Sequence, residues 1–570
     1  MLRLFQEHMI RKQQELEGMW EFIKADGGHY TLSVPGCWEQ HPLLNDYRGK
    51  GTYYRRIFVT EPCNLRLVFK GVSHTADVWL DDTYVMHHYN AYTPFCGVVR
   101  SVAPGEHLLK VEVDNSFSEQ STLHRPNDYY SYGGISRPVG LEQIGNVYIE
   151  NMHMTPIWEN DSWSAVIETR VVNMGEETDR FTIRGSLSER LDASQNEDEG
   201  CYLIEAQSCV LSAGEEKTLR WEQAFDGVKS WNPDAPVLYF LQLRLEKDGQ
   251  AFDDLIDRVG FRTVSLMGRR LCVNGEPVFL KGFNRHEDYG EIGCAIPPQL
   301  MAQDLDLMQD MGANAVRTCH YPNDERFLDM CDERGILVWE ENHSRGFREW
   351  LLENPLFEKQ CHDCVEEMIE YHFNHPSIVI WGILNEYGSD HPEARELYEK
   401  LYSQIKDLDR TRPTTSATCK HFKDLRLELP DMVSFNLYSG WYEDDNVRER
   451  HDRVMEWIGQ AGGAGKPVIV SEFGGGAVYG FRDRRRSKWS EERQADILLE
   501  NLEVYMNDPR LTGVFIWQFA DCRVTEEEWF AARPRSYNNK GVVDEYRRPK
   551  GACDIVRRLY RGQGREQRRN

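Results

Sequence analysis

Two apolar runs in this chain each end on a glutamate. The first covers Ser377–Leu384 and is followed by Asn385 and Glu386, and the second covers Pro467–Ser471 and is followed by Glu472. Such runs are typical of strands buried on both faces, and in a barrel of parallel strands the C-terminal ends of the strands open onto the active site. Retaining glycosidases need two carboxyl groups about 5–5.5 Å apart, one as acid/base and one as nucleophile. The two glutamates therefore indicate glycoside chemistry.

The elements that would position these glutamates begin at about residue 266, where strand-like runs alternate with amphipathic helical segments. We expect eight strands: Pro277–Gly282, Ala313–Thr318, Ile336–Glu340, Ser377–Leu384, Thr414–Cys419, Met432–Asn436, Pro467–Ser471 and Val514–Trp517. We expect helices at Gln299–Met311, Asp324–Glu333, Glu393–Leu408, Glu449–Gln460 and Glu491–Asn507. Eight repeats in roughly 300 residues predict a (β/α)8 TIM barrel. A doubly wound open sheet would normally show a Gly-rich turn after its first strand, whereas Phe283–Asp288 is polar.

Two β-rich parts precede the predicted barrel. Residues 1–145 hold many short alternating runs broken by turn signals, which predicts an all-β, jelly-roll-like sandwich. Residues 146–265 have the length and the pattern of an immunoglobulin-like sandwich. We therefore expect three domains, at 1–145, 146–265 and 266–570.

The predicted strand ends carry a ring of carboxylates, amides, aromatics and a few cations. Its members include His286, Glu287, Arg317, His320, Glu340, Glu341, Arg345, Asn385, Glu386, Asn436, Tyr438, Tyr442, Glu472 and Trp517. Alone, each of them is as well explained by packing, and His286 and His320 fit core histidines or, with Glu287, metal ligands. The two-carboxylate mechanism needs no metal, so we expect no metal and no other cofactor.

The composition limits the partners. A net charge of −26 argues against nucleic acid and anionic membranes. We find no signal peptide and no run of about 18 apolar residues, so we expect a cytoplasmic protein without a membrane span. The fourteen cysteines lack a framework spacing and are expected to be free thiols. Cys361 and Cys364 form a CxxC inside a helical pattern, which favours packing over redox or metal chemistry.

Five segments carry a resemblance to a known family: Gly282–Asp288, Arg317–Pro322, Trp381–Glu386, Asn436–Tyr442 and Val470–Gly474. Together they resemble glycoside hydrolase family 2 and, within it, the bacterial β-glucuronidases, over nearly the whole chain. The resemblance implies that Glu386 is the acid/base and Glu472 the nucleophile. It also implies a set of substrate or nucleophile contacts, namely His320, Asn385, Asn436, Tyr438 and Tyr442, with Trp517 as a wall of the sugar pocket.

The choice of subfamily depends on Asn538 and Lys540. They match an Asn-x-Lys element that, in the resembled β-glucuronidases, holds the C6 carboxylate of the sugar. An ammonium and an amide supply the cation and the donors that a carboxylate needs. The segment Asn127–Arg137 resembles the part of the family whose aspartate reaches the C4 hydroxyl, which implies that role for Asp128.

The sequence also departs from the resembled pattern. Arg345 stands where the family members we compare have an apolar residue, so it could add affinity for an acidic sugar or change which C4 epimer is accepted. The segment after the third strand is short, which indicates that the long lid of some bacterial relatives is missing and that larger aglycones fit. Arg533 and Arg535 do not align with the family pattern and receive no role.

These observations predict a retaining exo-β-glucuronidase. Its partner would be a small glucuronide or a uronic-acid-terminated oligosaccharide. The alternatives are a β-galacturonidase or dual uronidase, then a β-galactosidase of the same family, and last a non-catalytic carbohydrate-binding protein. Homo-oligomers are common in the resembled family, but we identify no interface pattern.

Overall fold

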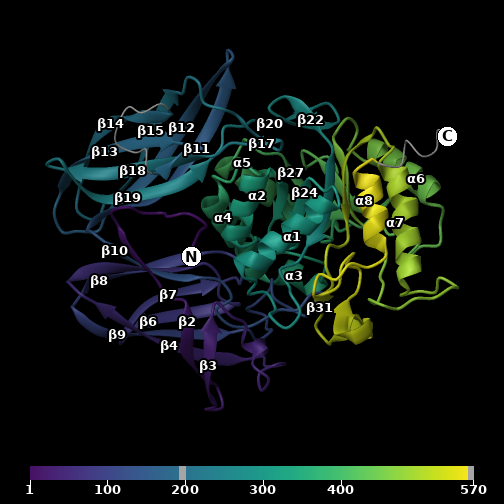
Figure 1. The fold of residues 1–570 in the computed structure, drawn as a ribbon, viewed down its shortest axis with the longest axis horizontal. Helices are drawn as coiled ribbons and strands as arrows, with labels where there is room; N and C mark the ends of the chain where they lie inside the picture. The colour runs from purple at the N-terminus through teal and green to yellow at the C-terminus, as the bar shows by residue number, and fades with distance from the viewer. Residues whose placement is uncertain (192–199, 563–570) are drawn as a thin grey trace.

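Two β-sandwiches lie beside a closed barrel in the computed structural model of the chain (Figure 1). The structure describes residues 1–191 and 200–562. The fold class expected from the sequence, a sandwich followed by an immunoglobulin-like sandwich and a TIM barrel, is confirmed.

The N-terminal sandwich packs a six-stranded sheet, ordered β3-β2-β4-β9-β6-β7, against a four-stranded sheet, ordered β1-β10-β5-β8. Its core alternates along the strands, so that Trp20 and Phe22 of β2 are fully buried while Glu21 between them is exposed. The strands are β1 Lys12–Glu15, β2 Gly18–Lys24, β3 His29–Val34, β4 Lys50–Val59, β5 Cys63–Phe69, β6 Thr75–Leu80, β7 Thr83–Tyr89, β8 Phe95–Val102, β9 Gly105–Asp114 and β10 Val139–Ile144.

The second sandwich packs a three-stranded sheet, ordered β11-β12-β15, against a four-stranded sheet, ordered β14-β13-β18-β19. Trp163, Ile183 and Leu243 are buried between these sheets. The strands are β11 Val147–Glu159, β12 Ser162–Asn173, β13 Asp179–Ser188, β14 Cys201–Leu211, β15 Glu216–Ala224, β18 Tyr239–Lys247 and β19 Gln250–Val259, with a short pair β16 Trp231–Asn232 and β17 Ala235–Pro236.

Eight parallel strands close the barrel, from β23 round to β30. They are β23 Leu280–Arg285, β24 Ala315–Thr318, β25 Leu337–Glu341, β26 Ile378–Asn385, β27 Thr414–Thr418, β28 Val433–Asn436, β29 Val468–Phe473 and β30 Leu511–Ile516. A small antiparallel sheet precedes them, with β20 Val264–Met267, β21 Arg270–Val273 and β22 Glu276–Val278. Its side chains share an apolar cluster with the barrel interior, which includes Trp339 and Phe515.

Two strand starts expected from the sequence are wrong by three residues. The last barrel strand begins at Leu511 and not at Val514. The first barrel strand begins at Leu280 and not at Pro277, because Pro277 pairs with Cys272 in the preceding antiparallel sheet. The strand also continues further than expected, since Asn284 and Arg285 pair with β24. Asn284 and Arg285 are therefore the last residues of β23 and not part of the turn that follows it.

The α-helices of the barrel domain are α1 Pro298–Asp310, α2 Glu325–Arg334, α3 Glu349–Glu353, α4 Pro355–His372, α5 Arg395–Leu408, α6 Val447–Gln460, α7 Glu491–Tyr505 and α8 Ala552–Tyr560. The expected helices are present as α1, α2, α5, α6 and α7, and the helical pattern around Cys361 and Cys364 is α4, whereas α3 and α8 were not expected. Side-chain caps begin several of them: Asp324 accepts from the Arg326 amide and Ser490 from the Arg493 amide. Cys361 and Cys364 lie on α4 as expected, and the cysteines in the described residues are free.

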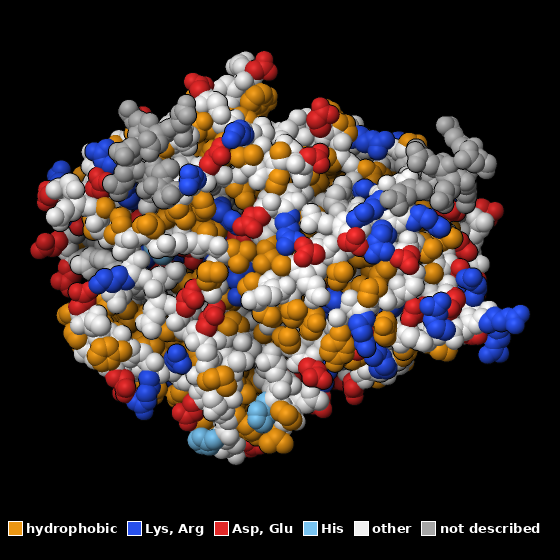
Figure 2. Space-filling model, viewed as in Figure 1, with side chains coloured by type: hydrophobic (Ala, Val, Ile, Leu, Met, Phe, Trp, Pro, Cys, Tyr) orange, Lys and Arg blue, Asp and Glu red, His pale blue; other side chains and the backbone are white. Residues whose placement is uncertain are grey.

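Short elements complete the polar end of the barrel. They are the pair β31 Cys522–Arg523 and β32 Tyr537–Asn538, and the 3-10 helices η1 Trp38–Gln40, η3 Pro392–Ala394, η4 Glu528–Ala532 and η5 Pro534–Ser536. Figure 2 shows acidic and basic side chains interspersed with apolar ones over one face, so the net charge of −26 is not gathered there into a single patch. Among the helices described, none is long and apolar enough to cross a bilayer.

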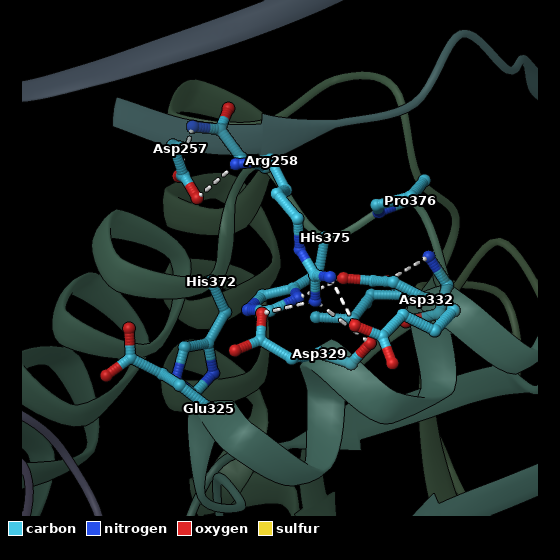
Figure 3. A network of polar contacts seen from close by, with 12 residues as sticks. Asp257, Arg258, Glu325, Asp329, Asp332, His372, His375 and Pro376 are labelled. Carbon is cyan, nitrogen blue, oxygen red and sulfur yellow. Dashed lines mark hydrogen bonds and ion pairs between the residues drawn. The ribbon is translucent and has the colours of Figure 1, made fainter. Parts of the chain in front are cut away.

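A buried ion network joins the second sandwich to the barrel. Asp329 of α2 accepts hydrogen bonds from Arg3 at 2.8 and 3.1 Å, and Arg258 of β19 lies 3.4 Å from the same carboxylate. Close by, His375 contacts Asp332 at 2.5 Å (Figure 3). Burial raises the pKa of Asp329, but Arg3 and Arg258 lower it by more, so the carboxylate stays ionised and its stabilising effect is lost as pH falls.

We expect Asp329→Asn to lower the free energy of unfolding by about 3–5 kcal/mol, because two buried guanidinium groups lose their shared carboxylate. The matched control is Asp306→Asn, since Asp306 pairs with Arg334 but its side chain is 68% exposed, and it should cost at most about 1 kcal/mol. Urea unfolding followed by tryptophan fluorescence measures both. Equal losses would contradict a structural role for this network.

Candidate active site

Glu386 lies at the polar end of the barrel, directly after β26. Its φ of 52° is in the left-handed region, which non-glycine residues adopt rarely and which is common at functional sites. Its amide donates to the Ala417 carbonyl at 2.8 Å, and its Oε1 accepts from Asn436 Nδ2 at 2.9 Å. These two bonds hold the backbone and the carboxyl group of Glu386 in place while the side chain remains partly open to solvent.

Glu472 lies inside β29 and is only 4% exposed. Its Oε1 accepts from Arg317 Nη1 at 2.9 Å, and its Oε2 accepts from the Tyr438 hydroxyl at 2.7 Å. His320 Nε2 is 3.8 Å from Oε1. Each carboxylate oxygen therefore has a fixed donor, which orients one lone-pair face of Glu472 toward the pocket.

Arg317 joins Glu472 to the rest of the strand ends. All five of its N–H donors are used: Nε and Nη2 bind Glu341, Nη1 binds Asn284 and Glu472, and Nη2 also binds Asn385, all at 2.9–3.0 Å. The guanidinium carbon lies 4.5 Å from the ring centre of Trp339, on top of the apolar core.

The carboxyl groups of Glu386 and Glu472 interact electrostatically. Burial and the charge of Glu386 raise the pKa of Glu472, and Arg317 and Tyr438 partly offset that rise. Nearby, burial raises the pKa of Glu341 to about 7 despite its contact with Arg317. A nucleophile must be ionised and a general acid must be protonated. The contacts of Glu472 with Arg317 and Tyr438 favour its ionised form.

A buried cation marks one end of the pocket. Lys540 is 2% exposed, and its Nζ donates to the Tyr442 hydroxyl at 2.8 Å. Arg533 Nη2 is 3.4 Å from the same hydroxyl. The two cations lower the pKa of Tyr442 against the effect of burial. In the part of the chain that the structure describes, Lys540 has no carboxylate within ion-pair distance. The ammonium group is therefore available to an anionic ligand.

The N-terminal sandwich contributes Asp128 to this end. Arg533 binds Asp128 with two donors, one of them Nε at 2.9 Å, and Asn538 Nδ2 donates to Asp128 at 3.0 Å. Asp128 is therefore brought together with Asn538 and Lys540, as the sequence predicted. Arg533, which received no role from the sequence, lies at the centre of this group.

Arg345 lies between the two ends of the site. Its backbone bridges to Asn385, its Nη1 donates to Asn127, and its Nε is buried without a partner. Burial opposes its charge, but Glu386 and Asp128 together raise its pKa, so it stays cationic. Arg535, by contrast, pairs with Glu545 at 3.0 Å and serves the scaffold.

His320 and Trp517 form a wall beside Glu472. Their rings stack with centroids 5.1 Å apart, and His320 Nδ1 is 2.6 Å from Glu341. Burial lowers the pKa of His320 well below its usual value, so the ring is neutral. Ligand atoms of His286, Cys319 and His320 lie within 4.8 Å of one another and could hold a soft metal ion, whereas Glu287 instead binds Arg137.

The sequence therefore missed two residues of the assembled site. The sequence placed Arg317 at a strand end and inside a family motif. Neither observation identified Glu472 as its hydrogen-bond partner. Arg533 had no usable signal, because it lies in the irregular segment between η4 and η5 and its partner is 405 residues away in sequence. The other predicted site residues, including Asn436 and Tyr438, all face this end of the barrel or line its rim.

A TIM barrel that carries two interacting glutamates at its strand ends belongs to the class of O-glycosyl hydrolases. The chain belongs to glycosyl hydrolases family 2: the family's TIM barrel domain matches residues 264–563, its central domain residues 147–262 and its sugar binding domain residues 15–144.

Similar proteins include a solved GH2 β-galacturonidase from Eisenbergiella tayi bound to galacturonate. It is 45% identical, with a TM-score of 0.94 over 99% of this chain and 100% of that one. A solved β-glucuronidase from an uncultured Clostridium sp. is 25% identical, with a TM-score of 0.85 over 98% and 99%. A β-glucuronidase of Paenibacillus borealis is 25% identical over 96% of this chain and 97% of its own length.

We expect Tyr438→Phe to move the acidic limb of the pH dependence of kcat/KM to higher pH. The hydroxyl stabilises the ionised form of Glu472, so its loss raises further a pKa that already lies above 4.5. A hydrogen bond to a charged group is worth about 1.5–3 kcal/mol, which corresponds to a shift of about one pH unit or more. Tyr505→Phe is the matched control, because its buried hydroxyl has no partner in the described residues. An unchanged limb in Tyr438→Phe would contradict the proposed contact.

Proposed function

We propose that this enzyme is a retaining exo-β-uronidase that hydrolyses β-D-glucuronides to glucuronic acid and an alcohol. Glu472 attacks C1 and forms a glycosyl ester while Glu386 gives its proton to the leaving oxygen. Glu386 then takes a proton from water, which attacks C1 and releases Glu472 as a carboxylate. The contacts of Glu472 with Arg317 and Tyr438 support its role as the ionised partner.

One observation carries the assignment to a uronide. Lys540 is a buried ammonium without a carboxylate partner in the described residues, and it meets Arg533 at the hydroxyl of Tyr442. A buried unpaired cation is costly, and an incoming carboxylate would remove that cost. A neutral sugar would leave Lys540 unpaired. The C6 carboxylate of a uronic acid therefore fits this end of the pocket.

The proposed exo action follows from what closes this end. Asp128 and Arg533 form a buried ion pair between the N-terminal sandwich and the barrel, and Asn538 binds the same aspartate. We infer that this buried ion pair blocks the continuation of a longer substrate beyond its terminal sugar. We therefore propose that one terminal uronic acid occupies the pocket, with Asp128 and Asn538 facing its hydroxyls.

A second candidate substrate is favoured by one comparison. The galacturonate-bound β-galacturonidase is 45% identical to this chain, and the substrate pair differs only at C4. Arg345 and the Asp128–Arg533 pair are the charged groups placed to respond to that epimer. A panel of p-nitrophenyl β-D-glucuronide, β-D-galacturonide and β-D-galactoside separates the candidates. Preference for the galactoside would overturn the proposed uronidase activity.

We expect Glu386→Gln and Glu472→Gln each to lower kcat on p-nitrophenyl glucuronide by about 10³-fold or more, since each removes a group that acts in the transition state. Circular dichroism should show an unchanged fold. Glu367→Gln, a substitution on helix α4 away from the pocket, is the control and should retain activity. An active Glu472→Gln enzyme would exclude the mechanism.

We expect Lys540→Ala to lower kcat/KM on uronides by about 10²-fold or more, which corresponds to an activation free energy raised by several kcal/mol. The rate on neutral glycosides should change far less. Comparing the glucuronide with the matching glucoside measures the difference. Equal losses on both substrates would remove Lys540 from carboxylate recognition.

We also propose that the enzyme is bacterial and cytoplasmic, and that it forms a homo-oligomer. Cell fractionation tests the first, and the molar mass in solution tests the second.

A further inference from the structure

A cleft of about 320 Å³ is lined by Glu386. Its walls come from the N-terminal sandwich and the barrel. Arg125 and Asn127 of the sandwich line it together with Arg345 and Phe347 of the loop after β25. Lys420, after β27, and Trp529 of η4 complete it. The cleft does not include Glu472 or Lys540. Because Glu386 protonates the leaving oxygen, whatever lies against it in this cleft is the leaving group.

The lining of this cleft is rich in cations. Four of them face it: Arg125, Arg345, Arg348 and Lys420. Arg348 pairs with Glu528, and Lys420 lies 3.4 Å from Asp390. Within residues 1–191 and 200–562, Arg125 and Arg345 have no ion-pair partner.

Arg125 in particular is held in place without charge compensation. Its Nη2 donates to the carbonyls of Arg345 and Gly346, the latter at 2.6 Å, and its Nη1 is buried with no partner. Burial and the neighbouring Arg348 and Arg345 lower the pKa of Arg125 to about 10, which leaves it cationic at neutral pH. A positive cleft in a protein of net charge −26 runs against the overall field, so its charge is local.

The cleft also offers an aromatic platform. Trp529 is 54% exposed at its rim and packs against Phe530, with ring centres 4.2 Å apart. An exposed tryptophan alone needs no explanation. Beside unpaired guanidinium groups it provides an apolar face for a sugar or phenol ring while the cations hold an acidic substituent.

We propose that this cleft is a leaving-group subsite that selects an anionic aglycone, such as a second acidic sugar or an acidic phenol. The inference rests on the proposed uronidase function. Carboxylate and sulfate share the chemistry that Arg125 and Arg348 recognise, namely a planar or trigonal array of charged oxygens that accept from guanidinium donors. The natural substrate would then carry negative charge on both sides of the bond that breaks.

Three synthetic β-uronides test this proposal, with 4-hydroxyphenylacetate, its neutral amide and 4-hydroxybenzylsulfonate as leaving groups. The carboxylate and the amide are near isosteres. We expect kcat/KM for the carboxylate to exceed that for the amide by about fivefold or more, and this ratio to fall when NaCl is raised from about 50 to about 500 mM. A sulfonate rate above the carboxylate rate would assign the subsite to sulfated groups. A carboxylate-to-amide ratio of one or less, with a sulfonate no faster than the amide, would overturn the proposal.

Variants locate the effect. Arg348→Gln and Arg125→Gln should each reduce the ratio of the anionic to the neutral substrate, a quantity that does not depend on the fraction of folded enzyme. The matched control is Lys423→Gln, an exposed residue outside the cleft that removes the same charge and should leave the ratio unchanged. An equal fall of this ratio in Lys423→Gln would show that net charge alone causes the effect, and it would overturn the subsite.

Different results would exclude the subsite and the uronidase function. If the enzyme cleaves all three uronides at one rate, the subsite is excluded and the uronidase function stands. If it cleaves p-nitrophenyl galactoside and none of the uronides, the uronidase function is excluded and the subsite with it.

Discussion

The polar end of the barrel depends on one buried guanidinium group. Arg317 uses all of its donors on Glu341, Glu472, Asn284 and Asn385, which come from four different strands. A buried charge is tolerated when it is fully paired and hydrogen-bonded, and removing any partner is costly. The register of β23, β25, β26 and β29 around Arg317 is therefore fixed by the same bonds that orient Glu472. In this barrel the condition for folding and the condition for a positioned nucleophile coincide.

A similar constraint explains why the sandwiches accompany the barrel. Arg533 draws Asp128 out of the N-terminal sandwich into the sugar end of the pocket, and Arg125 of the same sandwich hydrogen-bonds the loop that carries Arg345. On the opposite side, Arg3 and Arg258 fasten the N-terminus and the second sandwich to helix α2. Separating the domains would expose unpaired charges at each junction. The barrel alone would therefore hold the two glutamates and Lys540 but lack Asp128 and Arg125, which the N-terminal sandwich supplies.

The parts of this arrangement that follow from local pattern were predictable from the sequence. Strand-like runs located all eight barrel strands at least in part, and the polar ends of two apolar runs located Glu386 and Glu472. The start of the first strand was not predictable, because Pro277 and Val278 continue the same apolar pattern and only their pairing with β21 separates them from β23. Arg533 was not predictable for another reason. Its surroundings have no period, and its meaning depends on Asp128, with which it has no relation in sequence. A single sequence does not show which residues pair across such long separations.

The distribution of charge along the reacting bond follows from these pairings. A uronate in the pocket brings a second negative charge close to Glu472, whose pKa is already raised by burial and by Glu386. Without compensation, that charge would favour protonation of the nucleophile and slow the first step. In the proposed binding mode, Lys540 and Arg533 would offset the carboxylate of the sugar, while Arg317 hydrogen-bonds Glu472. In that binding mode Lys540 and Arg533 would both bind the carboxylate and reduce its effect on the pKa of Glu472. A substitution of either cation is therefore expected to affect the ionisation of the nucleophile as well as recognition of the sugar.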